Sequence, residues 1–185
     1  MARISLDPPR SLAVRLVKAY SKREYGKEME PALAVGHNPK VLVPYLRFEQ
    51  KVAKWKTLDP GLKTLAEMVV AARIGCEWCM DFGYWVSQER GVSPEKASKV
   101  PSWREHRDVF TELEQLVLEY AEAMTATPPA VTDDLSTRLQ KELGEKAFVE
   151  LTMMAAIENL RSRVNSAFGL TGQGFSDQCE IRPVS

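Results

Sequence analysis

The sequence lacks an excess of charge of either sign. Its 185 residues hold 25 basic and 25 acidic side chains, which cancel. Proteins that bind nucleic acid or an anionic membrane through electrostatics usually carry a basic excess, so we expect neither partner here. No apolar run approaches the ~20 residues that cross a bilayer, and "MARISLDPPRS" at the start holds no apolar signal core. These absences predict a cytoplasmic protein that binds no membrane.

Cysteine and histidine are both scarce. Three cysteines do not build a disulfide scaffold in a chain of this size, which favours a reducing compartment. Cys76 and Cys79 stand two residues apart in "ARIGCEWCMDFGYW". A tetrahedral zinc site needs four ligands, and the other candidates, Cys179, His37 and His106, are solitary. We therefore expect neither a metal nor another cofactor.

Period-two alternation is almost absent, whereas helical spacing recurs along the whole chain. Asn38 with Pro39 and Asp59 with Pro60 are typical helix starts, and Gly75 is a typical helix end. The pattern predicts helices within residues 8–26, 36–55, 58–75, 76–90, 93–100, 110–126, 132–144 and 145–169, followed by an irregular tail. This is an all-α class, and no linker divides the chain, so we expect one bundle-like domain over residues 1–185.

The cysteine pair has two competing interpretations once zinc is set aside. Gly75 ends one helix, so Cys76 is expected to open the next, where the N–H groups and the positive dipole end favour a thiolate. Positions i and i+3 share a helix face, so Cys76 and Cys79 can form a disulfide. Alternatively, both thiols are buried as small apolar side chains. The βαβ pattern of a thioredoxin-like fold is missing, so a redox pair here would belong to a helical fold.

Three stretches of this chain resemble one known family. They are "ALAVGHNPKVLVPYL", the run from "LDPGLKTLAEMVV" through the cysteine pair to "EKASKV", and the run from "LEQLVLEYAEAM" to "RSRVNSAFG". Together they are similar to the alkylhydroperoxidase D-like superfamily, also called the carboxymuconolactone decarboxylase family, over residues of about 30–170. The resemblance implies an all-helical domain of the alkylhydroperoxidase D-like type that assembles as a homo-oligomer, a trimer or a hexamer.

The resemblance also implies a chemistry for the two cysteines. In the peroxidase branch of the family the second cysteine, here Cys79, attacks a hydroperoxide, and the first, here Cys76, resolves the product. A dithiol reductant or a lipoyl-type carrier protein then regenerates the pair, and the resemblance has Cys76 exposed and facing that carrier. The decarboxylase branch lacks the cysteine pair, so the pair here points to the redox branch.

The sequence departs from that branch at two positions of its proton relay. Gly83 stands where the branch has a histidine, and Thr64 stands where it has a glutamate. Glu67 lies three residues after Thr64 and leans toward the preceding helical turn, so we expect it to replace the glutamate as general base. Its neighbours in "LAEMVVAA" are apolar, and burial would raise its pKa. The alternative is a surface position on an amphipathic helix. For the histidine we find no substitute.

Two further clusters have a structural and a functional interpretation each. The segment "IENLRSRVN" either forms a polar wall of the cysteine pocket or, as we favour, a satisfied buried network; its polar residues are Glu158, Asn159, Arg161, Arg163 and Asn165. The aromatic residues after the cysteines either line a hydroperoxide pocket or pack in the core, and we expect core packing for at least half of them. They are Trp78, Phe82, Tyr84 and Trp85.

These observations lead to a hypothesis with two rivals. The chain is expected to be a thiol-dependent peroxidase that reduces small organic hydroperoxides through Cys76 and Cys79, an antioxidant activity. The first rival is a dithiol–disulfide oxidoreductase or redox sensor with little peroxidase activity, which the missing relay residues favour. The second is an oligomeric ligand-binding module without redox chemistry. Self-association is also expected from the apolar run "AFVELTMMAAI".

Overall fold

The computed structural model describes residues 2–176, so Cys179 lies outside the described residues. This part of the chain contains eight α-helices, two short 3-10 helices and no strand, which confirms the all-α prediction. The elements are α1 (Leu12–Tyr25), α2 (Glu30–Val35), α3 (Pro39–Val52), α4 (Pro60–Ile74), α5 (Glu77–Glu89), α6 (Pro94–Lys99), η1 (Val100–Glu105), η2 (Arg107–Val109), α7 (Glu112–Thr125) and α8 (Asp133–Ala167).

The helix ends follow the local signals in the sequence. The Asp59 carboxylate accepts hydrogen bonds from the backbone N–H groups of Gly61 and Leu62, which caps α4. At the other end Gly75 adopts a left-handed conformation with φ of 78°. The break predicted between two helices near residue 144 is present as well, because Gly144 interrupts α8 with a non-helical backbone. The short helix α2 was not predicted.

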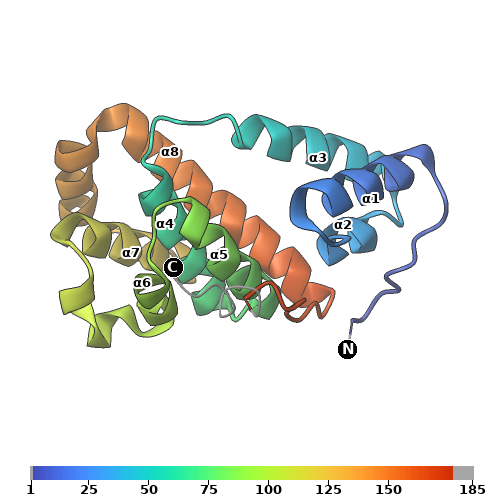
Figure 1. Ribbon diagram of the computed structural model, residues 1–185. Coiled ribbons are helices and arrows are strands. Elements are labelled where there is room, and N and C mark those ends of the chain that lie inside the picture. The colour runs from blue at the N-terminus through green and yellow to red at the C-terminus, as the bar shows by residue number, and fades with distance from the viewer. Residues whose placement is uncertain (1, 177–185) are drawn as a thin grey trace. The chain divides into compact units, whose positions relative to one another are not determined.

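The chain divides into two compact units. The first comprises residues up to 55 together with 167–171. Its helices α1, α2 and α3 contact one another and form one group (Figure 1). A small core of Val14, Val17 and Leu42 holds α1 against α3. The prediction of a single domain over the whole chain stays a prediction.

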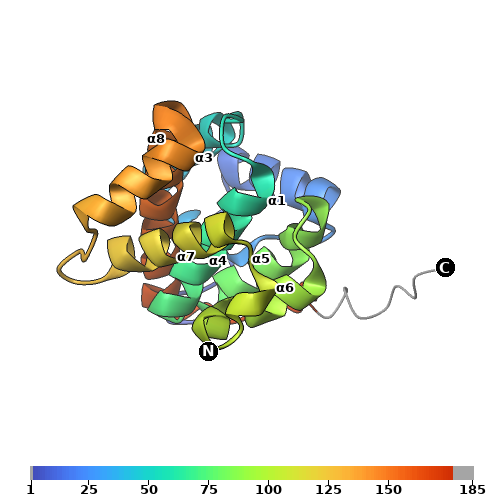
Figure 2. The same cartoon turned by 90° about the vertical axis from the view of Figure 1, so that its left-hand side faces the viewer.

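The second unit comprises residues 56–166 together with the chain from 172 onward, and it contains both cysteines of the pair. Its centre is α4, which packs against α7 and α5 (Figure 1 and Figure 2). Most of α4 is buried, and Leu65, Ala66 and Val70 are fully enclosed. Helix α4 therefore packs against several neighbouring elements, including α5, at whose start the cysteine pair lies.

Among the residues that the structure describes, no helix combines the length and the apolar character needed to cross a bilayer.

Candidate active site around the cysteine pair

The turn between α4 and α5 brings Cys76 and Cys79 together. Because Gly75 is left-handed, the chain reverses direction at once, and Cys76 becomes the N-cap of α5. Its sulfur accepts a hydrogen bond of 3.2 Å from the backbone N–H of Cys79. The two residues are joined by a disulfide, with their Cα atoms 5.3 Å apart. The expectation that Cys76 opens the helix is therefore correct, with Cys76 just outside the first turn.

The structure corrects one expectation about the pair. The family resemblance implied an exposed Cys76, but Cys76 is 1% exposed and Cys79 is 8% exposed. The physical reason is the capping role, since a capping side chain folds back over the first turn of its own helix. An attacking thiol would reach the Cys76 sulfur only after local opening of this region.

Asn165 contacts the second cysteine from the last long helix. Its side-chain nitrogen donates a hydrogen bond of 3.3 Å to the Cys79 sulfur. Asn165 is 4% exposed, so this contact is shielded from water. The less favoured interpretation of this segment, a polar wall of the cysteine pocket, is therefore the one that fits Asn165, although the direct contact with the Cys79 sulfur joins residues 86 positions apart and was not predicted.

Glu67 lies in a cluster of ion pairs. One carboxylate oxygen accepts a hydrogen bond of 2.8 Å from Arg90 at the end of α5, and the other accepts one of 2.7 Å from Arg161 of α8. Its side chain is only 15% exposed, which favours the buried over the surface interpretation. These two partners are guanidinium groups, and neither is a cysteine. The role of Glu67 as a general base stays a prediction.

A second carboxyl group in this cluster, Glu158, is more deeply enclosed. Its carboxylate accepts hydrogen bonds from the Ser162 hydroxyl at 2.7 Å and from Arg161 at 3.3 Å. Burial raises the pKa of Glu158 to about 7, helped by the nearby negative charge of Glu67, although Arg161 and Ser162 act in the opposite direction. The favoured interpretation of this segment as a buried network is thus supported for Glu158 and Arg161, whereas Asn165 reaches the cysteines.

The two positions where relay residues were missing hold no ionisable group. A side chain at Gly83 would place its first carbon 3.1 Å from Cγ of Met68, so a methionine from α4 fills that space. Thr64 is buried, and its hydroxyl donates to the backbone oxygen of Pro60. The relay histidine therefore has no replacement at its own position.

The aromatic side chains beside the cysteines form a cluster in which Trp78 is buried, whereas Phe82, Tyr84 and Trp85 are half-buried. Trp78 and Phe82 stack on each other, and Phe175 from the C-terminal segment packs edge-on against both. Phe175 also contacts Trp85 and is fully buried. Tyr84 packs against the main core instead. Core packing, which we expected for at least half of the four, is supported for Trp78 and Tyr84. The central residue of the cluster, Phe175, was not anticipated.

Asp81 holds the same C-terminal segment against α5. Its carboxylate accepts hydrogen bonds from the backbone N–H groups of Gln173, Phe175 and Ser176 and from the Ser176 hydroxyl. Burial alone would raise the pKa of Asp81, but these bonds to Ser176, Phe175 and Gln173 outweigh it and lower the pKa below its usual value. Trp78 adds a hydrogen bond from its ring nitrogen to Gln173. Residues 172–176 are therefore fastened to the helix that carries the cysteines.

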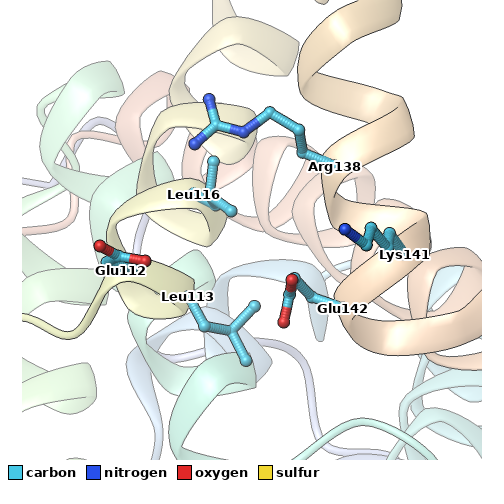
Figure 3. A pocket seen from close by; sticks show the side chains of 6 residues that line it. All are labelled: Glu112, Leu113, Leu116, Arg138, Lys141 and Glu142. Carbon is cyan, nitrogen blue, oxygen red and sulfur yellow. The ribbon is translucent and has the colours of Figure 1, made fainter.

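A hollow of about 210 Å³ lies elsewhere in the same unit, between α7 and the first part of α8. Figure 3 shows Arg138 extending from α8 over Leu116 of α7. The lining residues are Glu112, Leu113, Leu116, Arg138, Lys141 and Glu142. None of them belongs to α4 or α5, so this hollow is separate from the cysteine site.

Comparison with known proteins establishes the family. Residues 39–126 match the Carboxymuconolactone decarboxylase family. The Escherichia coli (strain K12) protein YnjA, which is uncharacterized, is 34% identical over 155 residues, or 83% of this chain and 85% of YnjA. The chain therefore belongs to the carboxymuconolactone decarboxylase family.

Solved structures of other proteins share this fold. The debrominase Bmp8 matches with a TM-score of 0.79 and 19% identity over 94% of each chain. An uncharacterized peroxidase-related protein with an alkylhydroperoxidase AhpD core, from Ralstonia eutropha JMP134, matches with a TM-score of 0.79 and 15% identity, covering 95% of this chain and 96% of that protein. Because identities this low establish only the fold, they confirm the alkylhydroperoxidase D-like architecture and leave the reaction to be argued from the site.

Proposed function

We propose that this protein is a thiol-dependent peroxidase that reduces small organic hydroperoxides through Cys76 and Cys79. The observation that carries the proposal is the pairing of the two sulfurs at the N-terminus of α5, with a side-chain donor on the Cys79 sulfur. A helix N-terminus favours thiolates, and a second thiol beside the first resolves an oxidised sulfur. Membership of a family that includes peroxidase-related proteins supports the same reading.

The reaction uses two electrons from the thiol pair. The Cys79 thiolate attacks one oxygen of the hydroperoxide, the O–O bond breaks, and the alkoxide takes a proton and leaves as an alcohol. Cys79 is then a sulfenic acid. The Cys76 thiolate attacks this sulfur, the S–O bond breaks as the disulfide forms, and the departing hydroxide takes a proton to become water. A dithiol reductant or a lipoyl-type carrier reduces the disulfide and becomes a disulfide itself.

Glu67 is our proposed general base for the Cys79 thiol, as the sequence suggests. Its two guanidinium partners keep the carboxylate in one orientation, and they also compete with any thiol for its oxygens. If Glu67 takes the proton, Glu67→Gln should slow the attack on hydroperoxide by about ten- to a thousand-fold. An unchanged rate would assign Glu67 to holding Arg90 and Arg161.

The decisive experiment measures consumption of cumene hydroperoxide with a dithiol reductant. We expect turnover by the unmodified protein and none by Cys79→Ser. Cys76→Ser should undergo one oxidation per chain and leave a sulfenic acid at Cys79 that dimedone traps. Dimedone labelling at Cys76 in the Cys79→Ser protein, with none at Cys79 in the reciprocal variant, would reverse the two roles.

A dithiol–disulfide oxidoreductase or redox sensor is the second candidate. The filled space at Gly83 and the absence of an ionisable side chain at Thr64 favour it, because disulfide exchange needs no relay to a peroxide oxygen. This candidate predicts a disulfide that equilibrates with dithiols while hydroperoxide consumption stays at the level of the Cys79→Ser control. Thiols that remain free after mild oxidation would instead favour a ligand-binding module without redox chemistry.

A further inference from the structure

We propose that Asn165 is a catalytic residue that stabilises the thiolate form of Cys79. A role of Asn165 in peroxidase turnover rests on the proposed function, whereas stabilisation of the Cys79 thiolate by Asn165 does not. The side-chain nitrogen of Asn165 donates a hydrogen bond of 3.3 Å to the Cys79 sulfur. Both residues are buried, so water does not compete for this sulfur as it would at the surface.

The chemistry of the amide explains why it favours one form of the sulfur. A hydrogen bond to an ionised acceptor is stronger than one to a neutral acceptor, and the difference grows in a buried site. The amide therefore stabilises the thiolate more than the thiol. Asn165 carries no charge, so its contribution does not depend on pH, unlike that of the histidine that is missing at Gly83.

The Cys76 sulfur accepts a hydrogen bond from the backbone, whereas the Cys79 sulfur accepts one from a side chain. The Cys76 sulfur accepts its hydrogen bond from the Cys79 backbone N–H, which every residue at position 79 except proline would supply. The Cys79 sulfur depends on a side chain of another helix. A substitution at Asn165 should therefore change the reactivity of Cys79 and leave that of Cys76 as it is.

The same contact is relevant to reduction of the disulfide. When a dithiol attacks the Cys76 sulfur, a bond forms between the reductant and Cys76, the Cys76–Cys79 bond breaks, and its electron pair leaves on Cys79. A leaving thiolate that is stabilised departs faster. Asn165 thus favours Cys79 both as the attacking sulfur toward peroxide and as the leaving sulfur during regeneration.

The test isolates one thiol. In a Cys76→Ser, Cys179→Ser protein, serine retains the cap at position 76, and Cys79 is the remaining cysteine. The rate of alkylation by iodoacetamide is measured against pH. Adding Asn165→Ala should move the midpoint of this profile upward by about one pH unit and slow alkylation at neutral pH by about ten-fold. Asn165→Asp, which keeps the side-chain volume, should move the midpoint further because its carboxylate repels a thiolate.

Two controls separate this effect from general loosening of the fold. Asn159→Ala removes another amide from α8, one that bonds to Thr125 instead of a cysteine, and should leave the Cys79 midpoint unchanged. Asn165→Ala in a Cys79→Ser, Cys179→Ser protein should leave the Cys76 midpoint unchanged. A more accessible site would raise the alkylation rate at every pH without moving the midpoint.

The outcomes are distinct from those for the proposed function. An unchanged Cys79 midpoint in both Asn165 variants, with circular dichroism showing folded protein, would overturn the inference even if the enzyme reduces hydroperoxides. Equal shifts at Cys76 and Cys79 would overturn it as well. A shift at Cys79 alone supports it, and it does so even where hydroperoxide turnover is absent and the proposed function fails.

Discussion

Glu67 and Glu158 share Arg161 as a partner but differ in their surroundings. Both oxygens of Glu67 accept hydrogen bonds from guanidinium groups, one from Arg90 and one from Arg161. Arg161 also donates a hydrogen bond to Glu158, but at 3.3 Å this bond is longer than its bond to Glu67. The other donor to the Glu158 carboxylate is the neutral Ser162 hydroxyl. The cluster therefore balances the charge of Glu67 well and leaves Glu158 in an environment that disfavours ionisation.

This difference predicts a pH dependence of stability at the residue scale. The pKa of Glu158 is raised from 4.5 to about 7 in the folded protein. Between these values the unfolded chain loses its proton first, so the folded state binds more protons and the free energy of unfolding falls as pH rises. We expect Glu158→Gln to remove this fall and to be more stable than the unmodified protein at pH 8 by about 1–3 kcal/mol.

Urea unfolding at pH 5, 6, 7 and 8 measures this prediction. Glu145→Gln is a matched control, since Glu145 is an exposed residue of the same helix, and its profile should follow that of the unmodified protein. A Glu158→Gln profile that runs parallel to the unmodified one would show that Glu158 ionises without cost in the folded state.

At the scale of elements, one side chain of α5 accepts four of the hydrogen bonds that attach residues 172–176 to this helix. Three backbone N–H groups and one hydroxyl point at the Asp81 carboxylate. Asparagine at this position would have one acceptor oxygen and a donor facing donors. We expect Asp81→Asn to destabilise the attached segment by about 1–3 kcal/mol, to raise the hydrogen-exchange rates of these amides, and to expose Trp78 to solvent.

The Asp81 attachment should also weaken in acid. The folded-state pKa of Asp81 lies below 3.8, so its stabilisation is present above that value and is lost as pH falls through the lower folded-state pKa. The unmodified protein at low pH should then show the faster exchange of the variant. Asp134→Asn, at a side chain that is 82% exposed, provides the control and should change neither property. Equal exchange rates in Asp81→Asn and the unmodified protein would contradict this account.

At the scale of the whole molecule, α8 presents apolar side chains to solvent in the single chain. Val149, Met153 and Leu160 are 60%, 41% and 47% exposed, and their spacing places them on one side of the helix. A contact between copies would bury them, as the resemblance to an oligomeric family implies. We expect light scattering to give a multiple of 20.8 kDa at micromolar concentration, with a trimer or a hexamer as the predicted state.

A charged side chain in this row should weaken the assembly. We expect Met153→Glu to shift the protein toward the monomer, because a carboxylate would be buried without a partner. Glu145→Gln serves again as the control that keeps the assembly. A monomer mass for the unmodified protein would remove the oligomer prediction.

Much of this fold was predictable because its signals are local. The caps at Asn38 and Asp59, the glycine ends of the helices and the break at Gly144 depend on residues within one turn of each other. The same is true of the cysteine pair, since an i,i+3 spacing at a helix start brings two sulfurs together. The six-residue helix α2 escaped prediction because its N-cap residue, Met29, supplies no side-chain cap, whereas Ser93 marks the start of the equally short helix α6.

The sequence by itself therefore determined the all-helical class and the main helix boundaries, and it brought Cys76 and Cys79 within reach of a disulfide. Only the tertiary structure decided what surrounds the pair. It placed Asn165 on the Cys79 sulfur, enclosed Glu158 and surrounded Phe175 with the aromatic residues of α5. Burial and contacts between distant segments depend on how whole helices pack, and spacing along the chain does not report them. For the same reason the sequence left the burial of Cys76 open between two interpretations, although it predicted the position of Cys76 at the start of the helix.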